Sequence, residues 1–146
     1  MSRSVAPAND FRNGAKPSPK TYWNAQGADR WRLNAHHLET ALAPFSKGII
    51  GHLAPEPNSR IVDIGCGTGD LTVELSRLVP TGQAIGLDIS LPLLEVALSR
   101  PEARTSLSVG FASGDAEADA FALRHFASEG VPFALEETTN HVEGLT

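Results

Sequence analysis

The sequence predicts an α/β fold in which helices precede and connect the strands of a parallel sheet. From residue 60 onward, short apolar runs alternate with segments whose apolar residues recur every three or four positions, the patterns of strands and helices respectively. A glycine-rich turn stands where the first such strand passes into the first such helix. Strand, helix, strand, helix, strand is a βαβαβ unit, and right-handed crossovers place its three strands side by side in the order 3-2-1.

The first 58 residues divide into an arm and a helical segment. Residues 1–20 mix Pro, Ser, Gly and Asn with charges and have no hydrophobic period, so we expect a disordered arm. Residues 21–58 are expected to be helical, because apolar residues recur at spacings of three and four: Trp31, Ala35, Leu38, Leu42 and Phe45. We interpret this stripe as core contact rather than a substrate site. Pro44 is expected to end or bend the helix, with a short second helix over 46–53.

Residues 59–120 hold the predicted βαβαβ unit. Its strands are expected at 60–64, 83–88 and 107–112, and its helices at 70–79 and 91–100. The run 61–64 is apolar on both faces, which is typical of a central strand with a neighbour on each side. The order 3-2-1 supplies only one of those neighbours.

The tail, residues 121–146, looks atypical beside this unit. It holds one candidate strand, Val131–Leu135, with Pro132 inside it and acids after it. Three explanations of the unpaired first strand stay open: a truncated product, completion by a partner chain, or a tail that folds over the open edge. We favour truncation, and we expect an exposed first strand to promote self-association.

The glycine-rich turn and a later acid indicate a ligand site. Glycines at positions 65, 67 and 69 permit positive φ and leave the backbone amides open to a ligand, and the helix start that follows favours an anionic group. Asp88 ends the second strand, where nucleotide-binding βαβ units accept hydrogen bonds from both ribose hydroxyls. Asp70 occupies the third glycine position of the dinucleotide fingerprint. Because a pyrophosphate would meet this carboxylate, NAD and FAD are disfavoured.

Length, composition and charge restrict the remaining classes. A chain of 146 residues with 41% hydrophobic residues suits one globular domain. The longest stretch without Asp, Glu, Lys or Arg is ten residues, whereas a membrane helix needs about 20. With no apolar signal segment, we expect a cytoplasmic protein without membrane contact. Residues 1–60 carry eight Lys or Arg and residues 61–146 carry four, too dispersed for nucleic acid, so a small molecule is the expected partner.

Three segments together resemble the class I S-adenosylmethionine-dependent methyltransferases. They are VDIGCGTGD at 62–70, GLDIS at 86–90 and SGDAEA at 113–118. The segments YWN at 22–24 and DRW at 29–31 are similar to a bacterial subgroup of that family whose small-molecule substrates are mostly unassigned. The resemblance covers about residues 21–120. It implies a Rossmann-like sheet, S-adenosyl-L-methionine as cofactor, a small-molecule methyl acceptor, and a missing C-terminal half of the usual fold.

The resemblance also implies roles for individual residues. The turn would border the methionine moiety through Gly65, Cys66, Gly67 and Gly69. Asp63 would orient the loop and the ligand's amino group, and Tyr22 or Trp31 would close the pocket. The nucleoside would be held by residues after the second and third strands. There Asp88 would take the ribose hydroxyls, Ile89 and Ala116 would lie on the adenine ring, and Asp115 would accept from its amino group.

No catalytic residue is predicted. Family residues on the acceptor side usually lie on loops after strands that do not occur here, and methyl transfer depends mainly on proximity and orientation. We interpret Cys66 as a loop-filling residue rather than a nucleophile. His36 and His37 are adjacent and face different sides of a helix, so no metal site is expected. The alternative function is a noncatalytic fragment that binds the cofactor or a partner.

Overall fold

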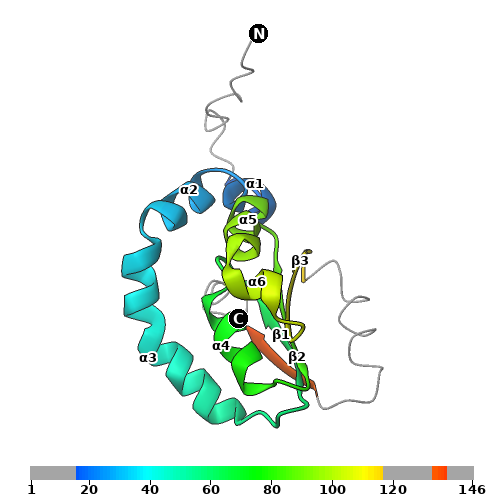
Figure 1. The fold of residues 1–146 in the computed structure, drawn as a ribbon. Coiled ribbons are helices and arrows are strands. Elements are labelled where there is room, and N and C mark those ends of the chain that lie inside the picture. The colour runs from blue at the N-terminus through cyan, green and yellow to red at the C-terminus, as the bar shows by residue number, and fades with distance from the viewer. Residues whose placement is uncertain (1–15, 117–132, 138–146) are drawn as a thin grey trace.

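The computed structural model describes residues 16–116 and 133–137 (Figure 1). Most of the predicted arm, and all of the predicted tail except one strand, lie outside the described residues. The first helix begins at Pro19, inside the segment predicted to be an arm. Ser18 caps it, because the Ser18 side chain accepts a hydrogen bond from the Thr21 amide at 3.2 Å.

The N-terminal segment forms three helices: α1 (Pro19–Trp23), α2 (Gln26–Leu33) and α3 (Ala35–Leu53). Pro44 was predicted to end or bend the helix; it does not end it, and no separate helix forms over 46–53, since α3 continues through the proline. Pro44 and Thr40 are both exposed, so the carbonyl that a proline at this position leaves unbonded can be solvated by water. The break occurs instead at Asn34, which ends α2 and begins α3 with φ −111° and ψ 10°.

The second half is an α/β unit. Its elements are β1 (Arg60–Ile64), α4 (Asp70–Leu78), β2 (Gln83–Asp88), α5 (Leu91–Ser99), α6 (Pro101–Thr105), β3 (Val109–Ser113) and β4 (Phe133–Glu137). The sheet is parallel with the order β3-β2-β1-β4, which confirms the α/β class and the 3-2-1 arrangement. The third strand begins two residues later than predicted, and Leu107 is 98% exposed outside it.

The expectation of an exposed first strand is wrong. β4 pairs in parallel with β1 on the side away from β2, with Ile61 opposite Ala134 and Ile64 opposite Glu137. β4 begins at Phe133, the residue after Pro132, so the proline does not interrupt the ladder. The sheet edges in the described part are therefore β3 and β4, and the argument for self-association through β1 no longer applies.

Alternate residues of the strands fill two apolar clusters, one on each sheet face. One holds Ile61, Leu71, Leu75, Val79 and Ala84, and three half-buried residues of α3 pack against it: Ile49, Ile50 and Leu53. The other holds Val62, Ile64 and Leu87. In Figure 1, α3 runs beside α4, while α1 and α2 lie at the end of the molecule where α5 begins. That end is the carboxyl edge of β1 and β2, where the predicted ligand residues stand.

Candidate functional site

The glycine turn between β1 and α4 has the left-handed backbone that its sequence predicts. The φ angles of Gly65, Gly67 and Gly69 are 74°, 54° and 84°, a region in which other residues are strained. A Cβ built at Gly67 would lie 3.8 Å from Nε1 of Trp31 and 3.9 Å from Cδ1 of Leu93. The backbone of Gly67 therefore faces a space beneath the Trp31 indole.

Gly69 is required for a different reason. A Cβ at this position would lie 2.6 Å from Cζ of Phe111 and 3.1 Å from Cβ of Ala97. The aromatic ring from β3 thus rests against the end of the turn. This contact accounts for the third glycine without a ligand.

The amides of the turn are used within the protein. Gly65 and Cys66 donate their N–H groups to the carbonyl of Leu87 at 2.8 and 3.2 Å, and Gly69 donates to the carbonyl of Cys66 at 2.9 Å. The prediction that the turn amides face a ligand is wrong for these three, because the turn is tied to β2 and closed on itself. These three amides are consequently not available to a ligand.

Asp88 joins the turn to the loop between β2 and α5. Its Oδ2 accepts from the Gly67 amide at 2.7 Å, and its Oδ1 accepts from the Ser90 amide at 2.7 Å. The residue is only 7% exposed. Burial raises the pKa of this carboxyl, while the hydrogen bonds from the amides of Ser90 and Gly67 oppose the rise. Each carboxylate oxygen can still accept a further hydrogen bond.

Asp63 lies beneath the turn, and Cys66 is a buried part of it. Asp63 is fully buried, and its Oδ2 accepts from the Thr72 hydroxyl at 2.6 Å, which orients α4 on β1. Burial raises the pKa of the Cys66 thiol well above its ordinary value, and the carboxylates of Asp63 and Asp88 add to the rise. A thiol in this environment stays protonated at neutral pH and is a poor nucleophile.

The residues predicted after β3 lie beside Asp88. The Gly114 amide donates to the main-chain carbonyl of Asp88 at 3.1 Å, which brings the two strand ends together. Ala116 packs against the apolar cluster of Val62, Ile64 and Leu87, and Asp115 next to it is half-buried. The predicted nucleoside residues therefore share one edge of the sheet.

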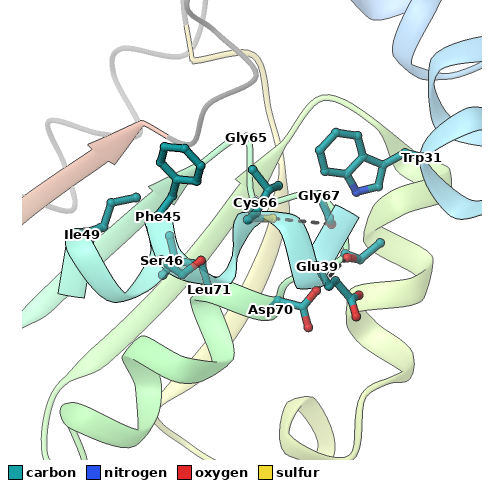
Figure 2. A pocket seen from close by; sticks show the side chains of 12 residues that line it. Trp31, Glu39, Phe45, Ser46, Ile49, Gly65, Cys66, Gly67, Asp70 and Leu71 are labelled. Atoms are coloured by element: carbon teal, nitrogen blue, oxygen red, sulfur yellow. Dashed lines mark hydrogen bonds between the residues drawn. The ribbon is translucent and has the colours of Figure 1, made fainter. Parts of the chain in front are cut away.

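A cavity of about 90 Å³ separates the turn from the N-terminal helices. Figure 2 shows Trp31 on one side of it and Phe45 on the other, with Cys66 and Gly67 at its floor. Trp31 thus lies where a pocket-closing residue was predicted, whereas Tyr22 does not line the cavity. Phe45 is 61% exposed and faces the cavity, so this part of the predicted core stripe borders the site.

Sequence reasoning missed the charged group at the cavity rim. Arg100, at the end of α5, contacts the Asp70 carboxylate at 2.6 Å and the Glu39 carboxylate at 3.5 Å. Its Nε donates to the carbonyl of Thr68 at 2.6 Å. A hydrogen bond with Asp70 and partial burial raise the pKa of Glu39. No local motif predicts this cluster, because its members come from three separate elements.

Two negative findings apply to the described residues. In the ranges 16–116 and 133–137, no three His, Cys, Asp or Glu side chains gather as they would around a metal ion. No helix in the same ranges combines the length and the apolar character needed to cross a membrane.

Comparison with known proteins places these features in context. A family model described as "Methyltransferase domain" matches residues 61–141, more than half of the chain. The match extends through β4 into the segment that looked atypical in the sequence. A ubiquinone/menaquinone biosynthesis C-methyltransferase from Pseudomonas aeruginosa is 37% identical over an alignment 157 positions long. The alignment covers 94% of this chain and 61% of the relative.

Two further matches are shorter or more distant. A demethylmenaquinone methyltransferase from Roseiflexus castenholzii is 36% identical over 87 residues, which cover 60% of this chain and 35% of the relative. The magnesium protoporphyrin IX methyltransferase of Synechocystis has a similar fold, with a TM-score of 0.54 and 21% identity over 66% of this chain and 49% of that one. The chain spans from 35% to 61% of the length of the two curated relatives.

Proposed function

Because the chain belongs to the class I S-adenosylmethionine-dependent methyltransferases, we propose that it binds S-adenosylmethionine at the carboxyl edge of β1 and β2 for methyl transfer to a small molecule. The observation that carries the proposal is the Asp88 carboxylate. It is buried, it is held by amides of both neighbouring loops, and each oxygen retains capacity to accept. Ribose hydroxyls are donors that suit such a group.

The charge of the site fits this cofactor better than a dinucleotide. Asp63, Asp70 and Asp88 lie around the turn, while the turn amides are engaged within the protein. An acceptor-rich site suits a ligand that carries an ammonium, a sulfonium and hydroxyl groups. A pyrophosphate would meet several carboxylates.

The chain's own residues would bind and orient the ligand. In the proposal, Asp88 and Asp115 accept from the nucleoside, Ile89 and Ala116 cover the adenine, and the turn from Gly65 to Gly69, including Cys66, borders the methionine end. Asp63 holds the turn in place through Thr72. When bound, the cofactor would supply an electrophilic methyl group for transfer to the acceptor. Transfer then depends on orientation more than on acid–base groups.

The acceptor is proposed from the names of relatives. One is named a demethylmenaquinone methyltransferase and another a ubiquinone/menaquinone biosynthesis C-methyltransferase, so demethylmenaquinone is the first acceptor to test. The cytoplasmic location and the absence of a nucleic-acid partner stay predictions from the sequence.

Isothermal titration with S-adenosylhomocysteine tests the proposal. We expect saturable binding by the wild-type chain and no binding of NAD. Asp88→Ala should weaken binding about a hundredfold, because it removes the carboxylate that would accept a hydrogen bond from each of the two ribose hydroxyls. Asp29→Ala is the matched control, since Asp29 is an exposed residue of α2. A folded wild-type chain that does not bind the ligand would contradict the proposal.

A second candidate function is cofactor binding without transfer. The chain spans at most 61% of the two curated relatives, so segments that complete those enzymes have no counterpart in the match. Formation of S-adenosylhomocysteine from S-adenosylmethionine only when demethylmenaquinone is added would favour the enzyme. Binding with no turnover across a set of acceptors would favour the second function.

A further inference from the structure

The side chain of Asn24, which is not among the predicted site residues, binds the loop that follows Asp88. Asn24, which ends α1, donates from Nδ2 to the carbonyl of Ile89 at 2.8 Å, and its Oδ1 accepts from the Leu91 amide at 2.9 Å. Nδ2 also donates to the carbonyl of Lys20 at 2.8 Å, within α1. The side chain therefore bridges one helix end and a loop 65 residues later.

The Leu91 amide belongs to the first turn of α5, where backbone N–H groups lack partners inside the helix. Asn24 supplies the partner for it. Ser90 supplies the partner for the Leu93 amide at 3.4 Å, and the Ser90 hydroxyl donates to the carbonyl of Trp23 at 2.6 Å. Three consecutive residues, 89–91, are thus fixed by Trp23, the last residue of α1, and by its cap Asn24.

The same loop orients Asp88. The Ser90 amide, which donates to Asp88 Oδ1, stands between the two groups that Asn24 binds. α1 and α2 also hold together tightly, because a Cβ at Gly27 would lie 2.5 Å from Cε1 of Tyr22. Trp23 meets Trp31 edge to face, with ring centroids 6.2 Å apart. The α1–α2 pair therefore contacts both loops of the site, one through Asn24 and the other through Trp31.

We propose that Asn24 is a positioning residue for the cofactor site, which acts by fixing the backbone of Ile89 and Leu91 so that the Asp88 carboxylate and the Ile89 side chain stand ready for the nucleoside. The proposal rests on the proposed function, because it assigns the loop a ligand. An asparagine suits the role because one amide both donates to two carbonyls and accepts from one N–H. An aspartate would place a carboxylate against the carbonyls of Lys20 and Ile89.

Asn34 provides a matched control. It ends α2 as Asn24 ends α1, and its Nδ2 donates to the carbonyl four residues earlier, that of Arg30, at 2.8 Å. The two residues share a type, a position at a helix end and a local hydrogen bond. Of the two, Asn24 is the one whose side chain bonds to the loop of Asp88 in the described part of the chain.

The experiment measures amide hydrogen exchange and S-adenosylhomocysteine affinity in the full chain. We expect Asn24→Ala to accelerate exchange over residues 88–93 but not over α4, and to raise the Kd about tenfold, the effect of losing two hydrogen bonds. Asn34→Ala should change neither quantity by more than about twofold. Asn24→Asp, which keeps the acceptor for Leu91 and loses the donated bonds, should accelerate exchange at the same residues.

The outcomes separate this inference from the proposed function. If the wild-type chain binds and Asn24→Ala behaves like Asn34→Ala in both measurements, the positioning role is overturned while the proposed function stands. If exchange accelerates at 88–93 in the Asn24 variants but the folded wild-type chain does not bind, both the proposed function and the positioning role fail. Accelerated exchange throughout the chain, including α4, would indicate a general structural role and would also overturn the proposal.

Discussion

The α/β unit and the N-terminal helices are held together in different ways. The α/β unit has apolar clusters on both sheet faces, whereas α3 contains no fully buried residue over its 19 positions. Ala28 is the only buried apolar side chain before Ser59 in the described part. Burial of apolar area therefore stabilises the sheet, while α1 and α2 depend on a few hydrogen bonds and ring contacts. Regions of the second kind open at a lower free-energy cost.

Replacing a leucine in each region should give the largest difference in the free energy of unfolding. Leu75→Ala removes a side chain that is fully buried between α4 and the sheet, and it should lower the free energy of unfolding by about 3–4 kcal/mol. Leu42→Ala, on the half-buried face of α3, should cost less than about 1 kcal/mol. Urea unfolding followed by circular dichroism measures both. Equal losses in the two variants would show that α3 is held as firmly as α4.

Glycine replacement should give effects of opposite sign in the two regions. Gly69→Ala forces a left-handed residue to carry a Cβ against Phe111, with an expected cost of about 2–3 kcal/mol. Gly48 lies inside α3, and a Cβ there meets nothing within 4 Å. Gly48→Ala should therefore stabilise the protein by about 0.5–1 kcal/mol through helix propensity.

Thermal melts of these two variants and the wild type provide the comparison. Destabilisation by Gly48→Ala would mean that α3 packs more closely than its exposure indicates. A neutral Gly69→Ala would mean that Phe111 moves away without cost.

The sequence predicted the α/β unit more accurately than the helices before it. β1 and β2 have the predicted bounds, because each is a short apolar run bounded by turn-forming residues. The break at Asn34 was missed, since the apolar stripe continues across it and its backbone geometry depends on how α2 meets the turn. The pairing of β4 with β1 was not predicted. A short run with a proline in it does not identify a sheet strand from its own residues, and the two strands are far apart in the sequence.

Some residues of the candidate site could likewise be predicted from the sequence, and others could not. The turn glycines and Asp88 follow a recognisable spacing, and the structure brings Gly67 and Asp88 into direct contact. Asn24 and Arg100 escaped prediction because each acts across more than 30 residues, Asn24 on Ile89 and Arg100 on Thr68. Such contacts depend on how whole elements cross, which periodicity does not encode.

Changes in pH should give the smallest difference between the regions. Burial raises the pKa of Asp88 above its ordinary value of 3.8, so the stability that its protonation confers is complete below that value and is lost as the pH rises through the raised pKa. Asp88→Asn removes this loss. The variant should therefore gain stability relative to the wild type as the pH rises from about 3.8 through the raised pKa of Asp88.

Glu39→Gln is the comparison from α3. The pKa of Glu39 is also raised, by a hydrogen bond with Asp70 first and by burial second, so the sign is the same. Because Glu39 is more exposed than Asp88, solvent should reduce the effect. Melting curves at several pH values measure both differences. A relative loss of stability by Asp88→Asn as pH rises would contradict the assigned direction.

The parallel pairing of β4 with β1 has a consequence for synthesis of the chain. β2 ends at Asp88 and β4 begins at Phe133, so a ribosome adding about 5–20 residues per second needs about 2–9 seconds to make the residues between them. During that interval β2 can already cover one side of β1, while the other side shows unpaired backbone to the cell. Open strand edges recruit other chains. The nascent protein therefore passes through a short period in which its own fold does not yet protect its central strand.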